Sequence, residues 1–135
     1  STFVPWKLAA AARVEQVEAV VEQCRTARDV RQEARALNQL ALMQTERGNK
    51  EKALEAIRAA VQCCRMADDE AGLLACSESW GGIHVKFGDF EVAQVRVREA
   101  AQMAQSIGDV LVQASCKRNL SLISMRRGRL RDAAV

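Results

Sequence analysis

The sequence predicts an all-α solenoid built from antiparallel helix pairs, and three observations lead to this fold class. Ala, Glu, Gln, Arg and Leu dominate the 135 residues, while one proline and seven glycines are the only strong helix breakers. Two kinds of landmark recur every forty residues, namely Asp29, Asp69 and Asp109, and Gly48, Gly88 and Gly128. Between them, apolar residues return at helical spacing. A fixed period of this length indicates units that bury their apolar faces only against their neighbours.

The first predicted helix covers residues 6–28. This stretch contains no glycine or proline, and Val14, Val17, Val20, Val21 and Cys24 recur along it at helical spacing. We therefore expect one amphipathic helix before the first repeat.

The first full repeat is predicted to contain two helices. Asp29 is an N-cap candidate for a helix over about 30–46. Gly48 can take the left-handed conformation that ends a helix, and Asn49 can cap the next helix, over about 50–67. The turn between the two helices is too short to host an elaborate active site.

The same cycle is predicted to run twice more. Asp68 or Asp69 caps a helix that reaches Phe87, Gly88 turns the chain, and residues 90–107 form its partner. A third pass begins at Asp109 and turns at Gly128, which gives six full helices and the start of a seventh. Trp80 and Phe90 fall on apolar columns, so we expect both to be buried.

The predicted organisation is one domain over 1–135, with an N-terminal helix over 6–28, repeats over 29–68 and 69–108, and a partial repeat over 109–135. Since the chain begins without methionine and stops inside a helical pattern, we expect a fragment of a longer array.

Charge and cysteine content narrow the class of protein. The net charge is +3, and most of the excess lies in the basic stretch Lys117, Arg118, Arg126, Arg127, Arg129 and Arg131, which only Asp132 accompanies. Five cysteines show no spacing typical of a disulfide framework, which predicts a reducing intracellular compartment, the cytoplasm first of all. No apolar run is long enough to cross a membrane, and the first residues do not read as a signal peptide.

The repeats resemble the tetratricopeptide repeat family, whose unit carries the pattern W-x2-L-G-x2-Y followed by A-x3-F. The matching residues are Leu40-Ala41-x2-Gln44 with Ala53-x3-Ile57, Trp80-Gly81-x2-His84 with Ala93-x3-Val97, and Leu120-Ser121-x2-Ser124 before Ala133. Residues 6–28 match only as a second helix, because Arg13 occupies the column of the small alanine. The period of forty exceeds the family's usual one of about 34, and the proline that often ends a unit is missing, which is similar to members with longer repeats.

The resemblance implies a right-handed superhelix in which the first helix of each pair lines a concave groove for a partner's peptide or helix. Carried over to this sequence, the groove residues are Arg35, Asn38, Leu42 and Thr45, then Ala75, Glu78, Gly82, Val85 and Lys86, then Ser115, Arg118, Leu122, Met125 and Arg126. A partly basic groove favours a partner with acidic side chains; the alternative is that these are ordinary solvated charges. Leu42 and Gly82 stand where chaperone-binding members need asparagine, so a C-terminal carboxylate ligand is not expected.

Other chemistries find little support in the sequence. His84 is the only histidine, and it is more typical of a packed, hydrogen-bonded residue than of a base or metal ligand. No residue pattern indicates an activated cysteine, a phosphate loop or a cofactor site. The basic stretch has three interpretations: a solvated helix face, a site for an acidic protein, or a nucleic-acid patch, the last without aromatic residues for base stacking.

The sequence therefore predicts a non-enzymatic adaptor or scaffold that binds a protein partner, without a cofactor or a membrane. A regulatory or sensor segment of a larger enzyme or transcription regulator is the first alternative, and a nucleic-acid-binding helical array is the second. Self-association through exposed ends of the array is a further option, because an uncapped solenoid leaves apolar surface at its last repeat.

Overall fold

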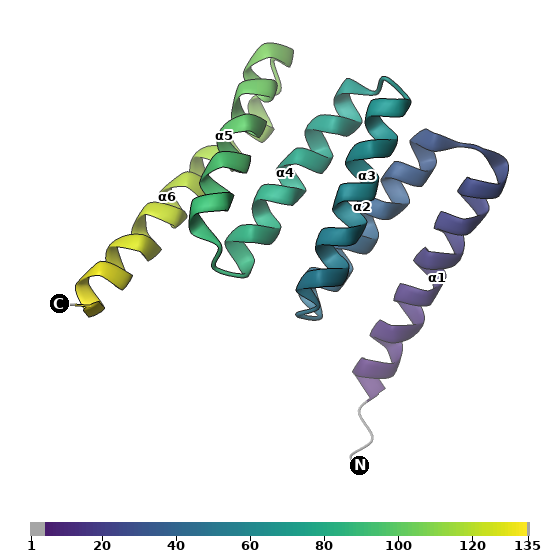
Figure 1. The fold of residues 1–135 in the computed structure, drawn as a ribbon, viewed down its shortest axis with the longest axis horizontal. Coiled ribbons are helices and arrows are strands. Elements are labelled where there is room, and N and C mark those ends of the chain that lie inside the picture. The colour runs from purple at the N-terminus through teal and green to yellow at the C-terminus, as the bar shows by residue number, and fades with distance from the viewer. Residues whose placement is uncertain (1–4, 135) are drawn as a thin grey trace. The chain divides into compact units, whose positions relative to one another are not determined.

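The computed structural model describes residues 5–134 of the chain, and side chains between residues 10 and 131. In that range it contains six helices and no strand: α1 (Pro5–Ala27), α2 (Val30–Glu46), α3 (Lys50–Met66), α4 (Glu70–Lys86), α5 (Phe90–Ile107) and α6 (Val110–Ala134). Turns of two or three residues join consecutive helices (Figure 1). The prediction of an all-α, solenoid-like fold is confirmed.

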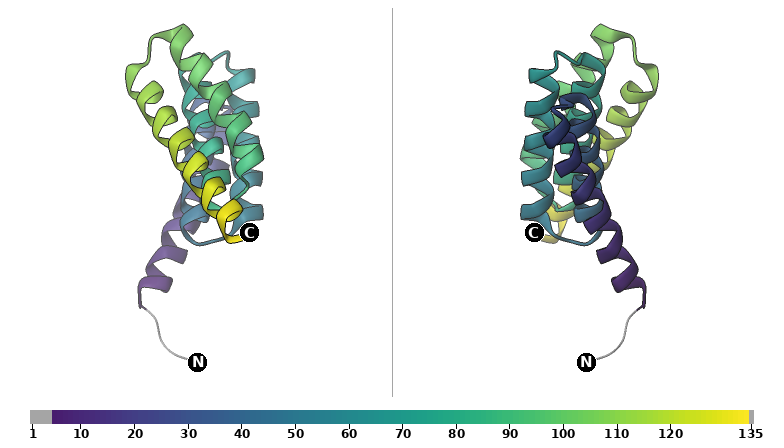
Figure 2. Two further views of the ribbon diagram at one scale, coloured as in Figure 1. Left: turned by 90° about the vertical axis from the view of Figure 1, so that its left-hand side faces the viewer. Right: turned by 90° about the vertical axis from the view of Figure 1, so that its right-hand side faces the viewer.

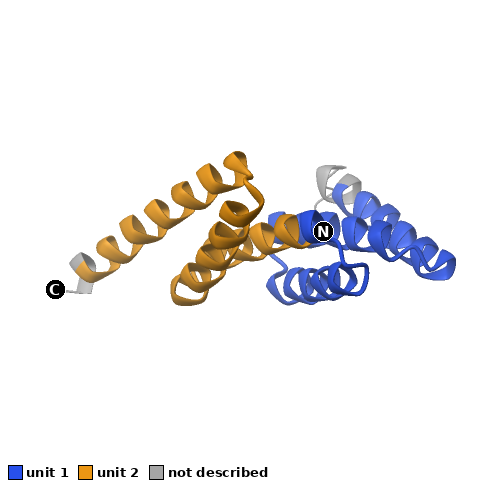
Figure 3. Ribbon diagram, turned by 90° about the horizontal axis from the view of Figure 1, so that it is seen from above, with its two compact units in different colours: residues 1–72 blue, residues 73–135 orange. Residues whose placement is uncertain are grey.

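The chain divides into two compact units, residues 1–72 and residues 73–135 (Figure 3). The first unit holds α1, α2 and α3, and the second holds most of α4 together with α5 and α6. Helix α4 begins at Glu70, so the division falls within its first turn.

In the first unit, α2 packs against both α1 and α3. Small residues stand where α2 and α3 approach, since Ala41, Ala53 and Ala60 are fully buried, and Ile57 fills the space beside them. Removing this apolar surface from water is the main favourable contribution to the packing. Helix α1 has 23 residues against 17 in α2 and in α3, and its N-terminal turns extend past the ends of both (Figure 2).

In the second unit, the core cluster contains Val85, Ala93, Val97, Ala100, Cys116 and Ile123. Helices α4 and α5 meet closely at Gly81, where an added Cβ would lie 2.8 Å from Cγ2 of Val97. The expectation that Trp80 and Phe90 are buried is wrong, because both are only half-buried. The Nε1 of Trp80 is buried without a hydrogen-bond partner, and the Arg96 guanidinium stacks over the ring with its carbon 3.7 Å from the ring centroid.

The turns that lead into α2, α4 and α6 are built alike. In each turn a residue with positive φ precedes an aspartate, and these residues are Arg28 (φ 56°), Asp68 (φ 51°) and Gly108 (φ 84°). The aspartate Oδ1 then accepts a hydrogen bond from a backbone N–H three residues later: Asp29 from Gln32 at 3.2 Å, Asp69 from Gly72 at 3.1 Å, and Asp109 from Val112 at 3.0 Å. The predicted aspartate caps are confirmed, and they satisfy donors that a helix start leaves unpaired.

The turns inside the helix pairs are built differently. Gly48 and Gly88 both take φ 78°, which is the left-handed conformation expected of them. Asn49 stands at the N-cap position of α3 but makes no side-chain cap bond, so that prediction is wrong. Its Nδ2 donates instead to Oε1 of Gln44 at 2.9 Å. The second pair repeats this arrangement with other residues, since Nδ1 of His84 lies 3.2 Å from Oδ2 of Asp89.

The turn predicted at Gly128 does not form, because α6 runs through this residue to Ala134. Gly128 does not take the positive φ of Gly48 and Gly88, so it continues the helix, although glycine lowers helix stability by about 1 kcal/mol relative to alanine.

Candidate functional site

Four predicted groove residues lie on α2, and they do not share one environment. Arg35 is exposed and Leu42 retains 44% of its surface, so both can meet a partner. Asn38 is half-buried, and its Oδ1 is buried without a hydrogen-bond partner. Thr45 is buried, and its Oγ1 donates to the carbonyl of Ala41 at 2.8 Å. Thr45 therefore faces the helix pair and is not part of a binding face.

The predicted groove residues of α4 divide in the same way. Lys86 is exposed and Glu78 is half-buried, whereas Val85 is a member of the core cluster. Val85 stands forty residues after Thr45, and both lie one turn beyond the small residue at which the two helices approach. This side of the first helix is covered by the second helix of its pair, so the assignment of Thr45 and Val85 to the groove is wrong.

Helix α6 presents the most continuous face among the predicted groove residues. Arg118 and Arg126 are exposed, Met125 retains 55% of its surface, and Leu122 is half-buried against the core cluster. Leu111 retains 83% of its surface.

Two residues of this face were not among the predicted groove residues, although Arg129 belongs to the basic stretch. Leu111 stands seven residues before Arg118, and the exposed Arg129 stands eleven after it, which places both on the same side of the helix. Extending the groove spacing in both directions would have found them. We name the face made of Leu111, Arg118, Leu122, Arg126 and Arg129 the arginine–leucine strip.

Not all of the basic stretch is free for a partner. Arg127 donates from Nη1 to Oε1 of Gln94 at 2.9 Å, and its Nη2 lies 3.9 Å from Oε1 of Glu91. It therefore ties α6 to α5 inside the second unit. Arg118, Arg126 and Arg129 form no ion pair with any side chain that the structure describes.

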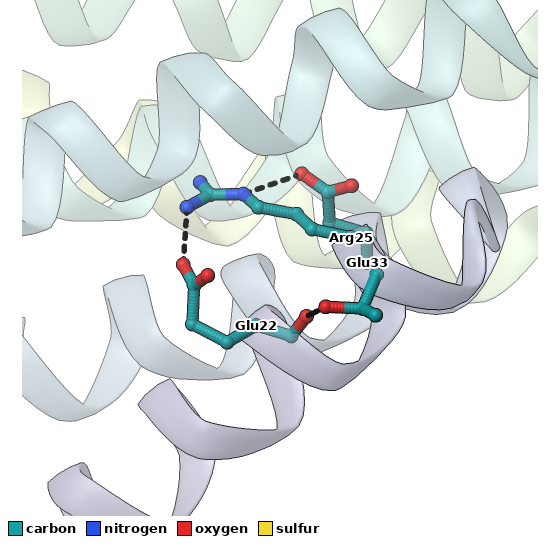
Figure 4. A network of polar contacts seen from close by, with 4 residues as sticks. Glu22, Arg25 and Glu33 are labelled. Atoms are coloured by element: carbon teal, nitrogen blue, oxygen red, sulfur yellow. Dashed lines mark hydrogen bonds and ion pairs between the residues drawn. The ribbon is translucent and has the colours of Figure 1, made fainter.

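The first unit contains a different kind of site, an ion-pair network between its helices (Figure 4). Arg25, near the end of α1, lies 2.7 Å from Glu22 and 3.1 Å from Glu33 in the first turn of α2. The hydrogen bond to Glu33, followed by the contacts with Glu22, raises the pKa of Arg25. Burial, followed by a hydrogen bond to Glu33, raises the pKa of the Cys63 thiol in α3 to about 11. Side chains from all three helices of this unit are thereby joined around Glu33.

A cleft of about 340 Å³ lies beside this network in the first unit. The apolar part of its lining consists of Val21, Leu37, Leu40, Ala56 and Ala59. The polar and charged part consists of Gln44 from α2, with Glu18, Glu22 and Arg25 from α1 and Lys52 and Glu55 from α3. The charges are of both signs, and Arg25 is already paired with Glu22 and Glu33. The cleft therefore shows no pronounced preference for a charged ligand.

The reactive residue types are held in structural roles. His84 is buried beside Asp89, in agreement with the prediction of a packed, hydrogen-bonded histidine. All five cysteines are unbridged. Burial raises the pKa of Cys116 as well as that of Cys63, which disfavours the nucleophilic thiolate at both.

Within the described residues, no group of three or more His, Cys, Asp or Glu side chains could hold a metal ion. No helix in the described part of the chain has both the length and the apolar character needed to cross a membrane.

Comparisons of this chain with protein-family models, with curated proteins and with solved structures give no match.

Proposed function

We propose that this chain is a non-enzymatic adaptor of the tetratricopeptide type, and that the arginine–leucine strip of α6 binds a protein partner. The observation that carries the proposal is the strip itself, in which three arginines and two leucines share one face of a helix. Leu111 is almost fully exposed at 83%, although a leucine gains most from leaving water. A binding surface accounts for both the exposed leucine and the unpaired arginines.

The chemistry of the strip defines its partner. Leucine side chains favour an apolar contact, and unpaired arginines favour carboxylates, which they can bind through two parallel hydrogen bonds. A helix or extended segment that places acidic residues beside apolar ones supplies both. We place this interaction in the cytoplasm, because five unbridged cysteines suit a reducing compartment.

A charge-reversal experiment tests this proposal. The parent chain and its R118E/R126E variant are used to capture proteins from a nuclease-treated lysate. The control variant is R58E/R98E, which reverses two exposed arginines on α3 and α5 and leaves the net charge matched. The proposal expects a partner that binds the parent and the control but not R118E/R126E. Equal capture by all three chains would contradict the assignment of the strip.

Nucleic-acid binding is the second candidate, and the exposed basic residues of α6 are the observation that favours it. Helix α6 contains no aromatic residue on which a base could stack. If nucleic acid is the ligand, binding disappears after nuclease treatment and weakens steeply with salt.

A further inference from the structure

The cleft in the first unit lies among the helices α1, α2 and α3. Its volume is about 340 Å³, and sites for small molecules enclose roughly 300–1,000 Å³. Leu37 of α2 and Ala56 of α3 line it as buried residues, and Leu40 of α2 lines it as a half-buried one. Every residue of the lining belongs to the first unit, so these three helices form the cleft by themselves.

The second helix pair shows what the equivalent place holds when it is filled. The period of forty puts Trp80 of α4 at the place of Leu40, and Arg96 of α5 at the place of Ala56. The two side chains meet, since the guanidinium carbon of Arg96 lies 3.7 Å from the centroid of the Trp80 ring. The ring is enclosed along one edge as well, because its Nε1 is buried. This place in a helix pair therefore accepts an indole ring with a group stacked on it.

The first pair has smaller side chains at both positions. Leu40 is smaller than a tryptophan, and the side chain of Ala56 ends at its Cβ. The space that a ring and a guanidinium take in the second pair is therefore left to the cleft in the first, where the apolar lining lacks contact partners. We propose that the cleft binds a small aromatic molecule without net charge, whose ring takes the place of the Trp80 ring.

The buried polar groups around the cleft are already engaged with one another. Arg25 lies 2.7 Å from Glu22 and 3.1 Å from Glu33. Oε1 of the buried Gln44 accepts a hydrogen bond from Nδ2 of Asn49 at 2.9 Å. A ligand that relied on a charge would have to break these contacts, whereas an uncharged ring leaves them intact.

The other charged residues of the lining are exposed and of both signs. They are Glu18 of α1 with Lys52 and Glu55 of α3. Exposed charges of this kind contribute little to binding, because water and salt screen them. Binding therefore depends on burial of the ring against the apolar lining, which is favourable in proportion to the area removed from water.

An NMR titration of the isotope-labelled chain tests the proposal, with indole as the probe. Indole is added up to about 5 mM, because a fragment of this size binds with a Kd of about 1 mM. The amide signals of Leu37, Leu40 and Ala56 are expected to shift and to reach saturation, while those of α6 stay in place.

The second pair supplies the variant that closes the cleft. L40W/A56R installs the two side chains of α4 and α5 at the equivalent places, and it is expected to weaken indole binding by at least about tenfold. L40W alone is the second variant, since a half-buried position tolerates a larger side chain. Q39W is the matched control, because it adds the same side chain to α2 at an exposed position outside the lining, and it is expected to bind like the parent. A thermal melt of each variant checks folding.

Three further probes define the ligand. Tryptamine adds a positive charge to the ring and indole-3-acetate a negative one, and both are expected to bind within about fivefold of indole, because exposed ion pairs contribute little. N-acetyl-tryptophanamide carries the ring between two peptide groups and so represents a tryptophan of a partner protein. It is expected to bind no more tightly than indole.

The results that would overturn the proposal are distinct. Indole that gives no saturable shift at the lining shows that the cleft binds no ring. Equal binding to the parent and to folded L40W/A56R places the ring elsewhere, and L40W is judged in the same way if the double variant does not fold. A charged probe that binds more than about fivefold tighter than indole identifies a charged ligand. The same gain with N-acetyl-tryptophanamide assigns the cleft to a partner protein.

Discussion

The pair α2–α3 in the first unit and the pair α4–α5 in the second share one framework but use different residues to build it. Each pair turns at a glycine with φ 78° and closes the turn with a side-chain contact between residues five positions apart. In the first pair the contact joins the amides of Gln44 and Asn49, and in the second it joins His84 to Asp89. At these turn positions the repeat therefore preserves hydrogen-bonding capacity rather than residue identity.

The largest effect is expected in the cores of the two pairs, at Ile57 and its equivalent Val97. Both side chains are almost completely buried, at 0% and 2% exposure. I57A should lower the free energy of unfolding by about 2–5 kcal/mol, because it removes buried surface and leaves a cavity. V97A should cost about 1 kcal/mol less, since one methylene fewer is lost. Urea unfolding of both variants measures the difference, and a V97A loss larger than that of I57A would contradict equivalent packing.

The next effect concerns the closest approach in each pair, at Ala41 and Gly81. G81A gains about 1 kcal/mol in helix propensity, but its Cβ would meet Val97 at 2.8 Å, and overpacking of this kind costs about 1–3 kcal/mol. A net loss of stability is therefore expected. In a V97A background the same change should be neutral or stabilising, because the obstructing methyl group is gone. A double-mutant cycle without coupling would show that the contact does not limit residue 81.

A smaller effect is expected from exchanging the two turn contacts. H84A should cost about 1–2 kcal/mol, because it removes the part-buried contact between His84 and Asp89. The double variant H84Q/D89N installs the amide pair of the first turn, so its stability should lie within about 0.5 kcal/mol of the parent. Thermal melts of both variants at one pH make the comparison. If the double variant is as unstable as H84A, the two turns are not interchangeable.

The smallest effect is the pH dependence that Cys63 adds to the stability of the first unit. Because folding raises the pKa of this thiol to about 11, the folded state holds its proton more tightly than the unfolded state does. The corresponding stability is present below the ordinary thiol pKa and is lost as the pH rises towards 11. Ultraviolet absorbance of the thiolate follows the titration, with C63A as the control. E33Q should lower this pKa, and an unchanged titration would exclude Glu33 as a contributor.

The periodic features of the fold were predictable from the sequence, but several of their contacts were not. Asp29 and Gly48 act where the pattern placed them, because helix caps and left-handed glycines depend on local backbone geometry. Asn49 has a residue type that often caps helices, but its side chain donates to Gln44 instead of capping α3. The backbone N–H groups of α3 and the Gln44 side chain compete for the Asn49 side chain, and residue type does not decide between them. Thr45 and Val85 were assigned to the groove by the family resemblance, yet both are buried, because exposure depends on packing that the resemblance does not specify residue by residue.

The sequence by itself determined the six helices and the aspartate caps of α2, α4 and α6, because helix propensity, apolar spacing and capping operate over only a few residues. The tertiary structure decided which faces remain uncovered, because exposure depends on whether another helix lies across each face. Met125 and Val85 stand at equivalent positions, and only packing makes one exposed and the other part of the core. Residue type alone does not decide the outcome at the glycines either, since Gly48 and Gly88 take a left-handed φ and end helices, whereas Gly128 continues α6.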